Sequence, residues 1–193
     1  HLVLQKFPEI YKVKCLNHTS DSSFLSPGNI QLVVIPDIVN QNVFNIYEPR
    51  VSQATLNEIA NFVNGLNSLH VKAAVINPDY EEVKVSLKVK FHKGYDENYY
   101  KKVLQTDITK LLSPWAFANK ARIDFGISVH QSALINYIEK LNYVDYIEEV
   151  ELSKEGIVQK SLVAPSSPKA ILVSAKEHTV NTEPKKCPEF SET

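Results

Sequence analysis

One segment of the chain repeats apolar and polar side chains with a strict period of two. Residues 83–91 place an apolar side chain at every odd position and a polar or charged one at every even position. Because successive side chains of a strand point to opposite faces, this pattern predicts a strand with one buried and one solvated face. Residues 30–35 form a nearly continuous apolar run that Pro36 ends, which is typical of a central strand buried on both faces.

Three stretches repeat their apolar residues every three to four positions instead, which predicts helices at residues 52–66, 96–111 and 130–141. Ser52 and Asp96 are suited to cap the first two, because their side-chain oxygens can accept hydrogen bonds from the unpaired N–H groups of the first turn. Pro114 ends the second helix, since the residue before a proline avoids helical backbone angles.

The order of elements along the chain mixes strands with helices. Further strands are expected at residues 11–16, 71–76, 123–129, 144–152 and 170–175. This order predicts the α+β class, with two small sandwich-like units, each a mixed sheet with helices on one face. We expect the first unit at 1–77, the second at 78–175 and a flexible, disordered tail at 176–193, where no apolar period remains.

Composition and charge exclude several classes of protein. The chain has 193 residues and is 44% hydrophobic, which is enough to bury a core. Its 21 basic and 22 acidic side chains nearly balance, which argues against a nucleic-acid binder that would neutralise phosphates with clustered Lys and Arg. No apolar run reaches the roughly 20 residues that a membrane-spanning helix needs, so we expect no membrane insertion.

The sequence offers little to catalysis. Its six histidines are scattered without metal-ligand spacing, and its 5 glycines form no phosphate-binding loop. Cys15 and His18 suggest a thiol–imidazole pair, but positions three apart on a strand point to opposite faces. We therefore predict no catalytic residue, metal, cofactor or small-molecule substrate. The open alternatives are an adaptor domain that binds a protein partner and, less favoured, a small hydrolase.

Three groups of residues are candidate contacts with a protein partner. They are a basic row (Lys84, Lys88 and Lys90), an acidic strand (Glu148, Glu149 and Glu151) and a pair of loop aromatics (Trp115 and Phe117). Two oppositely charged faces on one chain would allow neighbouring copies to dock head to tail. The alternative interpretations are that the charged rows keep the sheet soluble and that the aromatics fill the core.

A series of local phrases, in order along the chain, resembles the baseplate J-like family of contractile injection systems. The phrases are residues 4–15, 17–19, 27–36, 77–83, 91–96, 112–117, 125–132, 143–146 and 171–179. The chain departs from the family at Gly126-Ile127, where a second glycine is common, so the local turn is expected to differ.

The resemblance implies a structural role without cofactor or bond chemistry. Members of this family build the wedges of a sixfold baseplate and change their arrangement when the sheath contracts. The implied partners are other wedge subunits, including J-like copies, and neighbouring sheath or hub proteins. Assembly in the bacterial cytoplasm and a final place in the phage-tail or injection-particle baseplate are also implied. The absence of any methionine agrees with the C-terminal part of a longer subunit.

Overall fold

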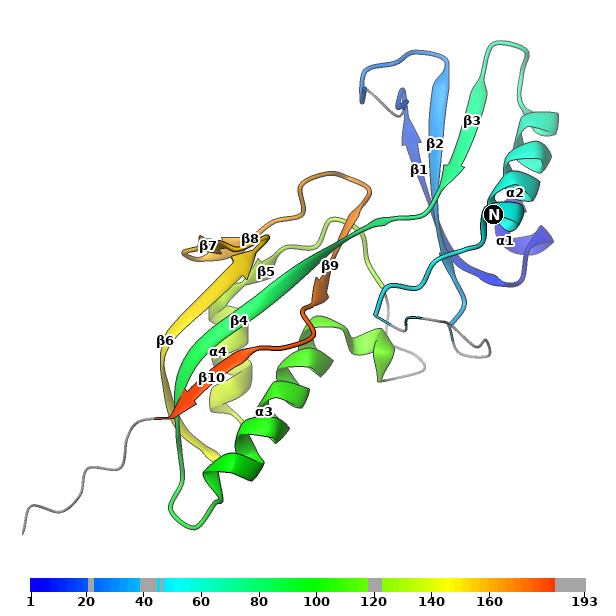
Figure 1. The fold of residues 1–193 in the computed structure, drawn as a ribbon. Coiled ribbons are helices and arrows are strands. Elements are labelled where there is room, and N and C mark those ends of the chain that lie inside the picture. Colours follow the sequence, from blue (N-terminus) through cyan, green and yellow to red (C-terminus); the bar gives the residue numbers. More distant parts are fainter. Residues whose placement is uncertain (21–22, 39–44, 46, 118–122, 183–193) are drawn as a thin grey trace, which may run out of the picture. The chain divides into compact units, whose positions relative to one another are not determined.

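The structure is a computed structural model that describes residues 1–20, 23–38, 45, 47–117 and 123–182 (Figure 1). By their contacts, the described residues form two compact units, each assembled from several chain segments. The first unit contains residues 1–81, 113–127 and 165–173, and the second contains residues 82–112, 128–164 and those from 174 onward. The chain therefore enters each unit more than once.

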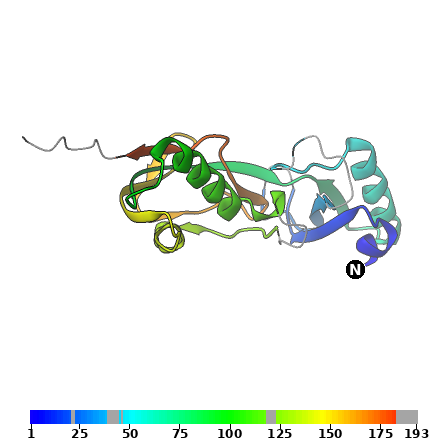
Figure 2. The same cartoon turned by 90° about the horizontal axis from the view of Figure 1, so that it is seen from below.

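The first unit is built on a three-stranded sheet with the order β1-β2-β3. Its strands are β1 (Ile10–Asn17), β2 (Asn29–Pro36) and β3 (Lys72–Ile76), and its helices are α1 (Leu2–Lys6) and α2 (Gln53–Leu66). Strand β2 pairs antiparallel with β1 and parallel with β3. Both helices lie on the same side of the sheet in two perpendicular views (Figures 1 and 2). Ser52 caps α2 as expected, because its Oγ accepts a hydrogen bond from the Thr55 N–H at 3.2 Å.

Strand β2 supplies side chains to two hydrophobic clusters among the described residues of this unit. Leu32 and Val34 pack with α1, α2 and β3, in a cluster that includes the fully buried Ile59. Ile35 belongs to a second cluster, which also contains Trp115, Ile123, Ile171 and Val173. Trp115 lies on a short 3-10 helix, Pro114–Ala116. The prediction of a strand buried on both faces is confirmed for β2.

The second unit packs two helices on one face of a larger sheet (Figure 1). The helices are α3 (Glu97–Leu112) and α4 (Gln131–Glu139). The strands are β4 (Asp79–Phe91), β6 (Val144–Lys154), β7 (Ile157–Gln159) and β10 (Thr179–Thr182), in the order β10-β4-β6-β7. Strand β9 (Ala170–Ser174) belongs to the first unit apart from its last residue. Strands β5 (Val129–His130) and β8 (Leu162–Val163) form a separate pair. The α+β class with mixed sheets is therefore confirmed.

Two expectations need correction. The flexible tail was expected from residue 176, but residues 179–182 form β10, which pairs parallel with β4 through Val180 opposite Leu87. Residues 183–193, including Cys187, lie outside the described residues. A strand was expected at 123–129, whereas only Val129 of this segment is part of a strand. Within the described ranges, no helix combines the length and apolar character needed to cross a membrane.

The packing of α2 generates a test of the first unit. Ile59 is 0% exposed and lies in the cluster between α2 and the sheet, so Ile59→Ala leaves a cavity there. We expect a loss of about 2–5 kcal/mol in the free energy of unfolding of this unit, measured by urea denaturation. Trp115, the chain's one tryptophan, lies in this unit, so its fluorescence reports the transition.

Leu66→Ala is the matched control on the same helix. The Leu66 side chain is 60% exposed, so its truncation should change the free energy of unfolding by less than about 0.5 kcal/mol. Equal effects of the two substitutions would contradict the assignment of the buried face of α2.

Candidate partner-binding surfaces

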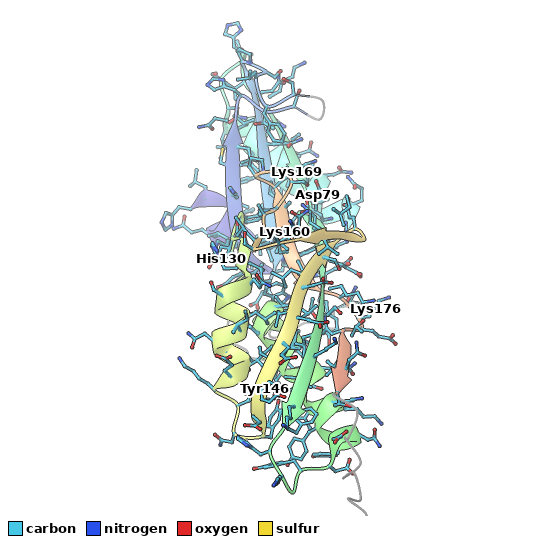
Figure 3. All side chains as sticks on the ribbon, turned by 90° about the vertical axis from the view of Figure 1, so that its left-hand side faces the viewer. Asp79, His130, Tyr146, Lys160, Lys169 and Lys176 are labelled. Carbon is cyan, nitrogen blue, oxygen red and sulfur yellow. The ribbon has the colours of Figure 1, made fainter. Side chains whose placement is uncertain are left out.

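Strands β4 and β6 bring the predicted basic row and acidic strand together on one face of the second unit. The two strands pair antiparallel, with Lys84 opposite Ser153, Ser86 opposite Glu151, Lys88 opposite Glu148 and Lys90 opposite Tyr146. Directly opposite residues of two paired strands point to the same side of a sheet. Figure 3, in which Tyr146 is labelled, shows β6, β4 and β10 side by side. We call this surface the mixed-charge face, defined by the six predicted charged residues and Tyr146.

An irregularity in β6 adjusts the spacing of the acidic residues. The register between β4 and β6 shifts between Ser86 and Lys88, where Glu149 has a φ of +49°. One extra residue in β6 at this point is a β-bulge, so Glu148 and Glu151 face the same way although they are three positions apart. The Glu149 carboxylate lies 2.5 Å from the Lys88 ammonium group. Both side chains are partly exposed, so this ion pair contributes little to stability.

The expectation of two separate, oppositely charged faces is therefore wrong. The antiparallel pairing of β4 with β6 places the lysines beside the glutamates, so the charges are balanced within a single surface. Lys90 also lies over the ring of Tyr146, 5.1 Å from its centroid. A partner that binds this face meets positive and negative groups side by side. Such a surface favours one alignment of the partner on the face over a general attraction to any charged protein.

The two aromatic candidates differ in exposure. Trp115 is 6% exposed and packs in the hydrophobic cluster with Ile35 and Ile171, so it fills the core of its own unit. Its buried indole Nε1 has no hydrogen-bond partner among the described residues. Phe117 is 44% exposed and contacts the Tyr47 ring edge-on, with ring centroids 6.3 Å apart. Of this pair, Phe117 alone presents a substantial surface to a partner.

A cluster of tyrosines near the turn between β4 and α3 was not singled out from the sequence. Tyr100 lies at its centre, with ring centroids 4.7 Å from Tyr95, 5.1 Å from Tyr99 and 5.0 Å from Tyr143. The Tyr143 hydroxyl donates to Asp107 Oδ2 at 2.8 Å. Burial, with this hydrogen bond and the charge of Asp107, raises the pKa of Tyr143. Tyr99 is 62% exposed, and exposed tyrosines are frequent in protein interfaces.

His178 is a buried side chain that connects β10 to the rest of the second unit. Its Nδ1 accepts a hydrogen bond from the Val85 N–H at 3.2 Å, and its Nε2 lies 2.9 Å from Ser174 Oγ. The Ser174 hydroxyl donates to the Ala175 carbonyl, so the arrangement fits a neutral imidazole that carries its proton on Nε2. The His178 carbonyl accepts from Gln105 Nε2 at 2.8 Å. Desolvation, reinforced by the charge of Lys84, lowers the pKa of His178 to about 4.

The structure brings together few groups that metal binding or catalysis could use. Among the described residues, no three His, Cys, Asp or Glu side chains gather closely enough to hold a metal ion. Cys15 is a free, exposed thiol that lies 3.3 Å from Asn17 Oδ1. The surfaces described above are therefore the candidate functional features of this chain.

Comparison with known proteins identifies the class. The chain belongs to the PVC11-like family of baseplate proteins, whose family model, described as "Baseplate protein PVC11-like", matches residues 1–176. A chain in the 6-fold symmetrised cryo-EM structure of the anti-feeding prophage (AFP) baseplate has the same fold, with a TM-score of 0.67 and 19% sequence identity. The match covers 90% of this chain and 35% of that chain. No curated protein matches. The baseplate class predicted from the sequence is thus confirmed.

The buried histidine predicts how stability depends on pH. An unfolded histidine has a pKa near 6.5, whereas folded His178 has one of about 4. The unfolded chain therefore binds more protons between these values, and this contribution to stability is lost as the pH falls from about 6.5 to 4. The expected loss is about 3 kcal/mol, measured as the unfolding free energy of the second unit at several pH values.

The variant His178→Asn should remove most of this slope, because Asn offers the Val85 N–H an acceptor that does not titrate. His130→Asn, at an exposed position of the same unit, should leave the stability at pH 7.5 unchanged. A slope in His178→Asn equal to that of the unaltered protein would contradict the role assigned to His178.

Proposed function

We propose that this chain is part of a J-like wedge subunit in the baseplate of a contractile, phage-tail-like injection particle. The observation that carries the proposal is the match of the baseplate family model to residues 1–176. The fold shared with a chain of the anti-feeding prophage baseplate supports it. Because this chain covers 35% of that chain's length, the remainder of such a subunit would supply further contacts.

In this function the chain acts through assembly and not through bond chemistry. Its partners are other wedge subunits, including J-like copies, and neighbouring sheath or hub proteins. The subunit assembles in the bacterial cytoplasm and becomes part of the particle. When the sheath contracts, its interfaces change from one packing to another, as interfaces with two discrete arrangements do.

Three surfaces of the described chain support a role in assembly. The mixed-charge face presents lysines and glutamates at positions that the pairing of β4 with β6 fixes. Phe117 and the tyrosine cluster present exposed aromatic area. Aromatic side chains are enriched among the residues that contribute most to binding at protein interfaces. We propose the mixed-charge face and Phe117 as partner contacts, whereas Trp115 fills the core of its own unit.

Affinity purification tests the proposed function. The protein that carries this chain is tagged in its own host, purified under native conditions and analysed by mass spectrometry together with everything that copurifies. We expect sheath, tube and other baseplate proteins. Recovery of a metabolic enzyme, or of no assembling protein, would contradict the proposal and would direct attention to Cys15.

A charge swap tests the mixed-charge face. The variant Lys88→Glu with Glu148→Lys and Glu149→Lys preserves the attraction between β4 and β6 but reverses the charges that a partner meets. We expect normal thermal stability and at least a tenfold loss of copurifying baseplate proteins, because mispaired charges at an interface cost about 2 kcal/mol or more.

The control swap uses exposed charges on the helices of the same unit, Lys102→Glu with Glu139→Lys. It should leave both stability and copurification unchanged. Normal copurification of the β4–β6 swap would show that the mixed-charge face takes no part in docking.

A further inference from the structure

Two loops at one end of the three-stranded sheet carry large apolar side chains in solvent. Phe24 and Leu25, between β1 and β2, are 48% and 89% exposed. Leu66 and Leu69, at the end of α2 and in the loop before β3, are 60% and 99% exposed. Figure 1 shows both loops at the same end of the sheet. We call these four side chains the apolar tip.

The two loops are held against each other by their backbones. The Lys72 N–H donates to the Gly28 carbonyl at 2.9 Å. Gly28 has a φ of +78°, and a Cβ atom placed on it would lie 3.0 Å from the His70 carbonyl oxygen. Glycine is therefore required both by the backbone angle and by the close approach of the second loop. The two loops that carry the apolar tip are thus joined through their backbones at Gly28.

Hydrogen bonds within the first loop and across the second fix their backbones further. In the first loop, the Thr19 N–H donates to the Asn29 carbonyl at 3.1 Å, and Asn29 Nδ2 donates to Ser26 Oγ at 2.9 Å. Across the second, the side chain of Asn64 in α2 bonds both backbone groups of Ala73 in β3, each at 2.8 Å. Two asparagines that flank the loops thus fix the loop backbones, while the four apolar side chains remain exposed. A surface ordered before binding loses less conformational entropy when it binds.

The sequence around the apolar tip is almost free of charge. Residues 59–71 contain no Lys, Arg, Asp or Glu, and within residues 15–30 Asp21 is the one such residue. The exposed Lys72, directly after the second loop, is the first residue of β3. A surface of this kind is complementary to an uncharged, apolar partner surface. Loops that bind membranes instead combine apolar residues with Lys or Arg for anionic headgroups, or with Trp or Tyr at the interface. The described residues of the two loops contain none of these types.

We propose that the apolar tip docks into an uncharged, apolar groove on a neighbouring protein of the baseplate. The proposal rests on the proposed function and adds to it a surface on the first unit. It names Leu25 and Leu69 as the principal contacts, because they are the most exposed of the four. None of these residues belongs to the mixed-charge face or to the aromatic surfaces described above.

Photo-crosslinking in the assembled particle tests this docking. The crosslinking residue p-benzoylphenylalanine replaces Leu25 in one variant and Leu69 in another, within the full protein expressed in its host. A third variant carries it in place of Leu2, which has the same 60% exposure as Leu66 but lies on α1. We expect the Leu25 and Leu69 variants to crosslink to one uncharged, apolar segment of another baseplate protein, and the Leu2 variant to leave that segment unlabelled.

A pair of substitutions provides an independent measurement. Leu25→Ser with Leu69→Ser should reduce incorporation into the particle at least tenfold, while Leu2→Ser should incorporate normally. The fluorescence of Trp115 during thermal unfolding reports whether the first unit remains folded. The substituted side chains are 89% and 99% exposed, so the fold should be retained.

The outcomes separate this inference from the function on which it depends. Crosslinks to a second copy of this chain, to lipid or to a charged segment, or normal incorporation of the double variant, would overturn the proposed partner. If the unaltered protein is itself absent from purified particles, the proposed function is wrong and the docking proposal fails with it. If the unaltered protein is present and the double variant incorporates equally well, only the docking proposal fails.

Discussion

The alternation of side chains along β4 is the constraint on which the second unit depends. Its five inward side chains, from Val83 to Phe91, are at most 8% exposed, while its lysines lie on the opposite face. A slip of one residue would turn Lys84, Lys88 and Lys90 into the core and place the apolar side chains in water. The cost of burying unpaired charges fixes the register of β4, and β6 and β10 take their own positions from it.

The local pattern was sufficient to predict those elements whose burial is periodic. Strands β2 and β4 and the helices α2, α3 and α4 have apolar residues at the spacing of their own structure, so one segment carries the whole signal. Strand β10 was missed for the opposite reason. Its four residues, Thr179–Thr182, include one buried apolar side chain, and they form a strand only because β4, about ninety residues earlier, offers an edge. Pairing between distant segments leaves no period in the sequence.

The sequence was sufficient to single out the charged residues of the candidate surfaces, but not to predict how these residues lie relative to one another. The sequence indicates that lysines line one strand and glutamates another, but only the antiparallel pairing shows that they share a face. The bulge at Glu149 was equally invisible, because it depends on which residues of β4 it opposes. For His178, a histidine surrounded by Lys, Glu and Thr in the sequence is expected in solvent. Its burial follows from contacts with Val85, Ser174 and Gln105 that come from three other segments.

The shortage of charge in the two loops of the apolar tip has a kinetic consequence. Charged surfaces draw partners together from a distance and can raise association rate constants to about 10⁸ M⁻¹ s⁻¹ or more, whereas neutral ones associate at about 10⁵–10⁶ M⁻¹ s⁻¹. A neutral contact therefore forms slowly from free solution and depends little on ionic strength. It forms readily once other contacts have raised the local concentration of the two surfaces. Such a contact belongs late in an ordered assembly, where it completes a junction that other surfaces have begun.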